Sequence, residues 1–330
     1  MGNFSYSVAI RTLGTAGEKY EKLLKSIQKQ TIQPKKIVVV LPEGHNKPEY
    51  QIGIEEFVFC KKGMIIQRLE ALKYIESDYI LFSDDDIEYS EKYIEKLTWA
   101  LESKGYDCVA GPLTELFPPN SLKYRLASVL GGACVMVHGK ENHYVRILGT
   151  GGWSYNHDIR FDEHRTYDTE SLPWANFLIK KDIMKKICFE DELWAERSGH
   201  SAFEDRIMFY KLIVNGYRVG VVSDAYYVHN DGGTSTRDLR LEPIYAASFN
   251  HYVFWHRFLY SLSHKPAERV WLKLCIEYYI LIGKVYSKCL CWLRRRTSEQ
   301  AKISIKGFQD AKVFVKSKEY SNLPSVYIKK

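Results

Sequence analysis

Three consecutive carboxylates, Asp84, Asp85 and Asp86, follow directly on the apolar run YILFS, which has strand character. Adjacent like charges repel, so such a cluster at the end of a buried strand favours a site that holds a cation. Mg²⁺ and Mn²⁺ prefer carboxylate and phosphate oxygens, so the triplet suits a divalent cation that also contacts phosphate. A solvated turn in which one Asp caps the next helix is the alternative. An EF-hand is excluded, because Tyr89 stands where its loop needs glycine and a strand precedes the acidic residues.

A second acidic pair, Glu204 and Asp205, lies in the helical stretch that Gly216 ends. Successive residues of a helix point about 100° apart, so the two carboxylates cannot both approach the same hydroxyl group. One alternative is an acidic first turn that interacts favourably with the helix dipole. The other is a general base that removes a proton from a hydroxyl nucleophile.

The elements that position these carboxylates follow from the apolar periodicity. Strand-like and helix-like segments alternate through the first third of the chain, and this βαβ order predicts an α/β fold with a mostly parallel sheet covered by helices. Ligands of such sheets bind at the carboxyl ends of the strands, where the triplet stands. We expect strands at 6–12, 35–41, 54–60, 78–83 and 107–113, and helices at 18–30, 64–75 and 91–104.

The rest of the chain divides into an irregular part and a helical part. Residues 114–172 are rich in Gly, His and aromatic residues, and we interpret them as an insertion with short strands. Regular elements return at 174–187 and at 200–222, where a strand follows the helix. From residue 241 onward the pattern is helical.

The composition limits the class of protein. The 330 residues are 45% hydrophobic, which is enough for one large domain or two ordinary ones, and disorder is not expected. The seven cysteines are scattered without a CxxC pair, which indicates neither a disulfide framework nor a zinc site and fits a reducing cytosol. The N-terminal residues show no secretory pattern, and Ser5 and Tyr6 do not match a myristoylation motif.

The positive charge is concentrated near the C-terminus. Residues 264–330 contain 15 Lys and Arg against 5 Asp and Glu, a net charge of +10, which leaves 32 basic and 35 acidic residues, or −3, for residues 1–263. We therefore expect no nucleic-acid partner for the core, and a tail that meets an anionic partner, with inner-leaflet lipid ranked ahead of RNA.

The longest apolar helix of this tail is interrupted by Glu277, Lys284 and Lys288, so no membrane-spanning segment is expected. An interfacial helix that ends in WLRRR is one interpretation. The alternative is that the tail helices pack together as a helical subdomain or as a homodimer contact.

Four stretches, in order, resemble the family 2 glycosyltransferases of the GT-A fold, inverting enzymes that use nucleotide-diphospho-sugars. Residues 6–40 resemble the opening strand, a helix with the Leu-x-x-Ser-Ile-x-x-Gln pattern and the second strand. Residues 61–97 resemble the Arg-bearing helix that leads into the DXD motif, here the triplet. Residues 176–193 resemble the acceptor-side strand and helix, and residues 199–233 resemble the Glu-Asp helix, the Gly-Tyr-Arg strand and a terminal His. The resemblance covers residues 5–232.

The resemblance implies a donor site that holds Mn²⁺ or Mg²⁺. Asp84 would face the ribose or uridine, Asp85 would be the variable middle residue, and Asp86 would hold the metal. His229 would add a metal or diphosphate contact, although an ordinary loop residue is the alternative. A metal that bridges the two phosphates stabilises the charge of the leaving group.

Further nucleotide contacts are implied at the ends of the first two strands and in the following helix. LPEGHN replaces the usual Asp-Asp-Gly-Ser, which leaves Glu43 as a substitute carboxylate. Arg237 and Arg240 follow a glycine pair, and their guanidinium groups suit a diphosphate, with a solvated basic turn as the alternative. For Arg68, the alternative to a nucleotide contact is a position on the protein surface. The implied nucleotide-sugar contacts are Arg11, Thr12, Glu43, Arg68, Asp84, Asp85 and Arg237, with a small loop at Lys62 and Gly63 beneath the nucleotide.

On the acceptor side, inversion requires a base opposite the diphosphate, and the family pattern implies Asp205 in this role. Glu204 would then bind the acceptor or act as a structural ligand. Trp153 and Trp174 are candidate stacking platforms for a sugar, because an aromatic face matches the C–H face of a pyranose. Core packing is the alternative for both.

We therefore expect an inverting, metal-dependent glycosyltransferase that moves a sugar from a nucleoside-diphosphate donor, with UDP-sugars expected first. The acceptor would be a glycan or lipid-linked saccharide in surface polysaccharide biosynthesis, at the cytoplasmic face of the membrane. The expected domains are 1–240, with a donor half (1–113) and an acceptor half (114–240), and a helical region at 241–330. A nucleotidyltransferase or phosphohydrolase on a similar sheet is less favoured, because RTLGTAGEKY is no Walker loop. A non-catalytic nucleotide-sugar-binding scaffold is the third alternative.

Overall fold

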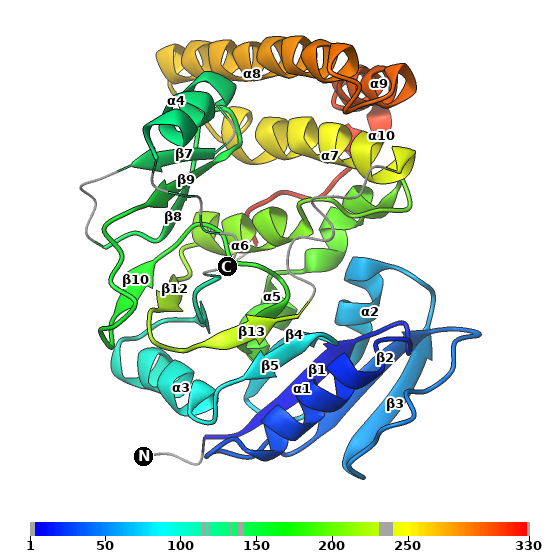
Figure 1. The fold of residues 1–330 in the computed structure, drawn as a ribbon, viewed down its shortest axis with the longest axis vertical. Helices are drawn as coiled ribbons and strands as arrows, with labels where there is room; N and C mark the ends of the chain where they lie inside the picture. The colour runs from blue at the N-terminus through cyan, green and yellow to red at the C-terminus, as the bar shows by residue number, and fades with distance from the viewer. Residues whose placement is uncertain are drawn as a thin grey trace.

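The computed structural model describes residues 4–113, 117, 119, 121–132, 134–137, 142–230 and 240–328. A central sheet is flanked by helices, and further helices cover one end of the molecule (Figure 1). The predicted α/β class, with its mostly parallel sheet and C-terminal helical extension, is confirmed. Through the first half the elements are β1 (Tyr6–Arg11), α1 (Glu18–Gln28), β2 (Ile37–Pro42), β3 (Glu55–Cys60), α2 (Met64–Ala71), β4 (Tyr79–Asp84), β5 (Ile87–Tyr89), α3 (Tyr93–Ser103), β6 (Cys108–Ala110), α4 (Leu122–Gly131), β7 (Cys134–Val137), β8 (Val145–Ile147) and β9 (Trp153–Asn156).

The second half begins with strands and ends in helices. Its elements are β10 (Thr166–Asp168), β11 (Asn176–Lys180), α5 (Lys181–Lys186), the 3₁₀ helix η2 (Phe189–Glu196), α6 (Glu204–Val214), β12 (Val219–Val222), β13 (Tyr227–His229), α7 (Leu241–Phe254), the π-helix η4 (Trp255–Tyr260), α8 (Pro266–Trp292), α9 (Ser298–Phe314) and α10 (Lys318–Ser321).

The central sheet has eight strands in the order β10-β12-β6-β11-β4-β1-β2-β3. β1 pairs in parallel with both β2 and β4, whereas β11 lies antiparallel between β4 and β6. In the β1–β4 register, Arg11 stands opposite Asp84. The strand order therefore brings a cation from the first strand next to the first carboxylate of the triplet.

The strands carry apolar residues on both faces, because helices cover both faces of the sheet. Alternate residues enter two cores, so that Val38 and Val40 of β2 face one core and Val39 and Leu41 face the other. A continuous apolar run is the expected pattern for a strand between two helical layers. α1 packs on one face through Tyr20, Leu23, Leu24 and Ile27, and α2 packs on the other.

The insertion predicted at 114–172 contains short strands, as expected, together with the helix α4. β7, β9 and β8 form a separate three-stranded sheet, while β10 joins the edge of the central sheet next to β12. A third sheet pairs β13 with β5, with His229 opposite Ile87. This pairing places His229 beside the residue that follows the acidic triplet.

The helices after residue 240 pack on the sheet domain and on one another. Phe249, Val253 and Phe314 share a core with the strands. α8 forms a small cluster of its own with Trp255. Among the helices that the structure describes, none combines the length and the apolar content of a membrane span. A domain boundary at residue 240 stays a prediction.

Candidate active site

The candidate site lies where β1 and β4 end, next to the start of α6 and the end of β13. Asp84 is the last residue of β4, and its side chain is half-buried. Its Oδ1 accepts from Arg11 Nε at 3.2 Å and from Arg68 Nη2 at 2.8 Å. Burial raises the pKa of Asp84, but Arg11 and Arg68 together lower it by more, so the net pKa lies below its ordinary value. Asp84 is therefore held as a carboxylate.

Arg68 links the two acidic groups of the site. Besides Asp84, its guanidinium contacts Glu204 Oε1 through Nη1 at 3.3 Å, and it lies 4.9 Å from the ring centre of Trp174. The side chain is only 4% exposed. The alternative of a surface role for Arg68 is therefore wrong, because α2 turns this residue into the protein.

Asp85 has a neutral partner. Its Oδ2 accepts from Thr12 Oγ1 at 2.5 Å, and the same hydroxyl accepts from the backbone N–H of Gly14 at 2.9 Å. Burial raises the pKa of Asp85 to about 6, and Thr12 opposes the rise. Thr12 and the middle Asp of the triplet thus form one hydrogen-bonded unit at the ends of β1 and β4.

Asp86 lies against His229. The two side chains approach to 3.2 Å between Oδ2 and Nε2, and the Asp86 carbonyl oxygen accepts from the backbone N–H of Asn230 at 2.9 Å. The other carboxylate oxygen of Asp86, Oδ1, is buried and has no hydrogen-bond partner within the described residues. A buried carboxylate oxygen without a donor is suited to a cation. No group of three or more His, Cys, Asp or Glu residues in the described parts could hold a metal alone, so further ligands would have to come from a substrate.

Glu204 and Asp205 form the first turn of α6. Burial raises the pKa of Glu204 to about 7, with Arg68 opposing and Asp205 adding to the rise. Burial also raises the pKa of Asp205, although its Oδ1 accepts from the backbone N–H of Arg206 at 2.7 Å. Asp205 is half-buried, and Glu204 is turned toward Arg68. Glu204 therefore points toward Arg68, and the helical spacing predicts a different direction for Asp205.

A strained residue precedes this pair. Phe203 has φ 66° and ψ 21°, in the left-handed region that bulky side chains rarely adopt. Its ring packs against Trp153, with centroids 5.5 Å apart, and against the guanidinium of Arg206 at 4.1 Å. Backbone strain of this kind persists where the surroundings enforce it, often next to functional groups.

The two candidate stacking residues lie in different surroundings. Trp174 is 3% exposed, and its ring packs with Phe189 and the Arg68 guanidinium, so its faces are covered in this structure. Core packing, the alternative, describes it better. Trp153 is half-buried and donates from Nε1 to Ser171 Oγ at 3.3 Å.

The other predicted donor contacts are only partly brought together. Glu43 is exposed, at the end of β2. Gly63 precedes α2, where the Glu196 carboxylate accepts from the backbone N–H of Ile65. Arg237 lies outside the described residues.

Sequence reasoning missed Gln67 and Arg206. Gln67 is buried and donates from Nε2 to the carbonyl oxygens of Thr12, at 3.2 Å, and Val40, at 3.0 Å, so it ties together the ends of β1 and β2. Arg206 is fully buried, donates to the carbonyl oxygen of Gly151 and packs on Trp153. A polar residue at a helical position that should be apolar is the one signal that the sequence offers for either residue.

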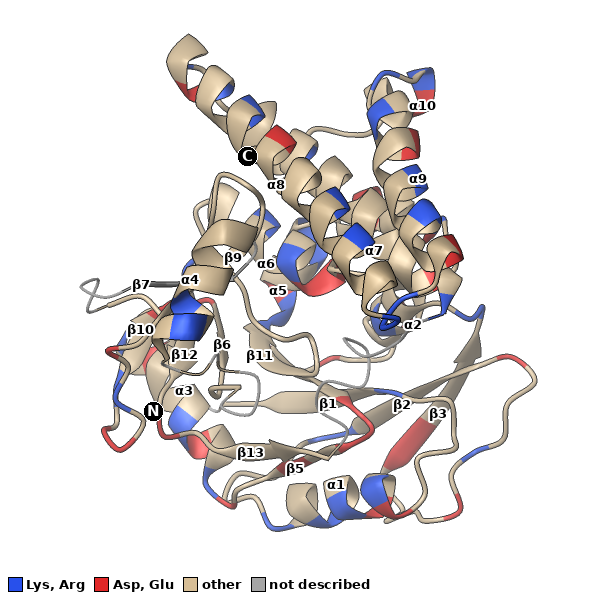
Figure 2. Ribbon diagram, turned by 45° about the horizontal axis from the view of Figure 1, so that its top comes forward, with Lys and Arg blue, Asp and Glu red and all other residues tan. Residues whose placement is uncertain are grey.

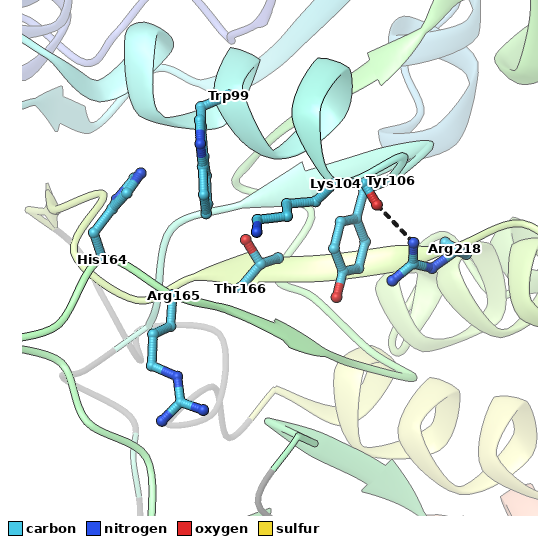
Figure 3. Close-up of a pocket in the computed structure, with 7 residues that line it drawn as sticks. All are labelled: Trp99, Lys104, Tyr106, His164, Arg165, Thr166 and Arg218. Carbon is cyan, nitrogen blue, oxygen red and sulfur yellow. Dashed lines mark hydrogen bonds between the residues drawn. The ribbon is translucent and has the colours of Figure 1, made fainter.

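A pocket of about 310 Å³ lies away from these acidic groups, at the β10 edge of the sheet (Figure 3). Two of its polar side chains already have partners. Arg218 donates to the carbonyl oxygen of Lys104 at 2.7 Å, and His164 contacts Asp224 at 2.7 Å. We therefore do not assign the pocket to the candidate site. It is lined by Trp99, Lys104, Tyr106, His164, Arg165, Thr166 and Arg218.

Residues 50–187 match the family model described as Glycosyl transferase family 2. The match includes β4, the acidic triplet and β11, and it confirms the resemblance seen in the sequence. Over these residues the chain is similar to glycosyltransferases of family 2, and its mixed sheet flanked by helices agrees with the GT-A fold that the sequence resemblance implied. No curated protein matches the chain.

Two solved structures resemble the chain at low sequence identity. A crystal structure of GalNAc-T7 with UDP, GalNAc and Mn²⁺ is 12% identical, with a TM-score of 0.47, over 83% of this chain and 55% of that one. This chain therefore corresponds to about half of the GalNAc-T7 chain. A crystal structure of S. aureus TarS 1-349 is 15% identical, with a TM-score of 0.44, over 94% of this chain and 92% of that one.

Proposed function

We propose that the chain is an inverting, metal-dependent glycosyltransferase that takes a sugar from a nucleoside-diphosphate donor, with UDP-sugars first. The acceptor would be a hydroxyl group of a glycan or lipid-linked saccharide, in the synthesis of a surface polysaccharide. One observation carries the proposal: Arg68 joins Asp84 and Glu204, so the DXD strand end and the acidic start of α6 meet in one site.

The donor side is supported by the residues around the triplet. Arg11 and Thr12, at the end of β1, contact Asp84 and Asp85. These residues would orient the nucleoside through hydrogen bonds at the strand ends, where ligands of such sheets bind. Because Asp84 is already neutralised by two arginines, it would accept hydrogen bonds from the ribose or base rather than hold the metal.

Asp86 and His229 fit a divalent cation. Asp86 Oδ1 is a buried acceptor without a donor in the described structure, and His229 lies against the second oxygen of the same carboxylate. Two protein ligands leave room for diphosphate oxygens, as is usual for Mg²⁺ and Mn²⁺. The bound cation would supply positive charge that stabilises the departing diphosphate.

On the acceptor side, Asp205 would remove the proton of the attacking hydroxyl. Glu204 is engaged by Arg68, which leaves its neighbour as the group that can face a substrate. The raised pKa of Asp205 favours this role, because a base is more effective when its pKa approaches the working pH. Attack from the face opposite the diphosphate would invert the anomeric configuration.

A donor screen tests the proposal. The full chain is incubated with UDP-, GDP-, dTDP- and CMP-sugars, with Mn²⁺ or with EDTA, and free nucleotide and sugar products are measured. We expect turnover of one nucleoside-diphosphate sugar, best with a UDP-sugar, that EDTA removes and Mn²⁺ restores. Full activity in EDTA would contradict the metal assignment, and absence of turnover with nucleotide-sugar binding retained would favour the scaffold alternative.

A further inference from the structure

The helix α8 has one buried face and one exposed apolar face. Leu272, Ile276 and Ile280 are four residues apart and face the protein, where they cluster with Trp255. Side chains spaced three and four residues apart share one side of a helix. The side of α8 opposite the buried one carries Trp271, Leu274, Tyr278, Leu281 and Val285, which are between 40% and 63% exposed.

The helix α4 extends this apolar surface. Tyr278 Oη donates to the carbonyl oxygen of Leu130 at 2.6 Å, which joins the C-terminal part of α4 to α8. Leu126, Val129 and Leu130 are each more than half exposed. Large exposed apolar patches on proteins mark sites of interaction. We use the name α4–α8 surface for Leu126, Val129, Leu130, Trp271, Leu274, Tyr278, Leu281 and Val285.

Basic residues lie along one flank of α8 and at its two ends, next to the α4–α8 surface. Residues 264–297, which contain α8 and its two ends, carry eight Lys and Arg against two Glu. Figure 2 shows these cations along α8, which projects at the end of the molecule opposite α1. Lys284 and Lys288 are exposed one turn apart, and Arg294, Arg295 and Arg296 follow the end of the helix.

The charge decides between two occupants of this surface. A second copy of the chain would bring the same cations to the contact, and like charges repel there. The headgroups of an anionic bilayer complement the cations, and the bilayer interface accepts the apolar and aromatic side chains. Trp271 carries both an apolar ring and a polar N–H group, which suits it to this boundary.

We propose that the α4–α8 surface binds bilayers that contain anionic lipid, with α8 lying in the plane of the interface. A helix of this length extends about 40 Å, so it offers several turns of apolar contact without entering the bilayer end-on. Basic side chains along one flank of α8 would contact the headgroups. This inference is independent of the proposed reaction, because it concerns a different surface and needs no substrate.

The test is cosedimentation of the full chain with vesicles of phosphatidylcholine alone or mixed with phosphatidylglycerol. We expect binding to the mixed vesicles, little binding to phosphatidylcholine, and a loss of binding as salt is raised. Leu274→Ser with Leu281→Ser should weaken binding about tenfold or more, because two apolar side chains no longer enter the interface. Lys284→Glu with Lys288→Glu should have an effect of similar size.

Matched controls separate this surface from general changes in the protein. Val313→Ser removes an apolar side chain from α9 that is 70% exposed, and Lys22→Glu with Lys29→Glu reverses two exposed lysines at α1. Both controls should bind vesicles as the parent does.

Two results would overturn the proposal. Equal binding to the two kinds of vesicle would show that anionic lipid is not what the surface recognises. A parent dimer that Leu274→Ser with Leu281→Ser converts to a monomer in sedimentation velocity, with unchanged vesicle binding, would assign the surface to a second copy of the chain.

Discussion

Asp84 and Glu204 share one partner, Arg68, but their surroundings move their pKa values in opposite directions. Burial raises the pKa of both carboxylates. Asp84 also contacts Arg11, and the two arginines together bring its pKa below the ordinary value. Glu204 has Arg68 alone at contact distance, with Asp205 as a like-charged neighbour, and its pKa rises to about 7. The opposite pKa shifts therefore follow from the closer contact of Asp84 with two cations and from the like-charged neighbour of Glu204.

The comparison separates two kinds of acidic group within one site. The strand-end group is fixed by sheet pairing and by cations, which suits a binding role with constant charge. The helix-start group, Glu204, is buried with too little compensating charge, so its carboxyl group binds a proton more readily than that of Asp84. The predictions below test this division, beginning with the largest expected effect.

Asp86→Ala should abolish metal-dependent donor binding. The substitution removes the one carboxylate of the triplet whose buried oxygen has no donor in the described structure, and His229 alone would hold a cation poorly. Titration calorimetry of UDP in Mn²⁺ and in EDTA measures the effect. We expect the Mn²⁺-dependent part of the affinity to disappear in Asp86→Ala and to persist in Asp162→Ala, at an exposed position. Equal affinities of Asp86→Ala and the parent in Mn²⁺ would place the metal elsewhere.

Arg68→Met should destabilise the protein by about 3 kcal/mol or more, because it leaves buried carboxylates with less compensating charge. Urea unfolding at pH 8 measures the loss in the free energy of unfolding. The same substitution at Arg160, whose ion pair with Glu163 is exposed, should cost less than about 1 kcal/mol.

A double substitution shows whether Arg68 joins the two groups. In a Glu204→Gln background, Arg68→Met should cost less than in the parent, because one of the two charges that it compensates is gone. Additive effects would mean that the contact of Arg68 with Glu204 contributes little, and the link between the two acidic groups would lose its support.

Asp205→Asn should reduce the transfer rate by about 10²-fold to 10⁴-fold, the usual contribution of a positioned base, and leave the affinity for the donor nearly unchanged. The isosteric amide keeps the volume and cannot accept the proton. Steady-state rates with the donor found in the screen, together with donor titrations, measure the two effects. Asp162→Asn serves as the control. A parallel loss of donor affinity would place Asp205 on the donor side of the comparison.

Much of the fold could be predicted from the sequence, because each apolar strand and amphipathic helix carries its own local pattern. β4, for example, is the apolar run that precedes the triplet, and α6 ends before the predicted stop at Gly216. α4 was not predicted, since it buries little apolar surface of its own and its exposed leucines do not produce a clear amphipathic pattern.

The candidate site could be predicted only in part. The triplet and the Glu-Asp pair are visible because they are charged residues in positions that apolar or neutral residues usually hold. Their linkage through Arg68 could not be predicted, since Glu204 lies 136 positions along the chain from its partner. The buried Arg206 and the strained Phe203 depend on tertiary packing in the same way. Whether Trp153 or Trp174 faces a ligand also depends on the residues that pack against each ring in the folded protein, and the local sequence does not show these contacts.

The smallest expected effect concerns the pH dependence of stability, and it tests the protonation of Glu204 directly. The pKa of this carboxyl rises from its ordinary value of 4.5 to about 7 in the folded protein. Between these values the folded chain holds a proton that the unfolded chain releases. The stabilisation that comes from protonated Glu204 is therefore complete below pH 4.5 and is lost as the pH rises through 7.

Glu204→Gln cannot titrate, so the stability of the parent relative to this variant should fall by no more than about 3 kcal/mol between pH 4.5 and 8. Urea unfolding at several pH values, with the exposed Glu88→Gln as control for the substitution itself, measures this change. Parallel stability curves for the parent and Glu204→Gln would show that Glu204 stays ionised like Asp84, and the two acidic groups would then be alike.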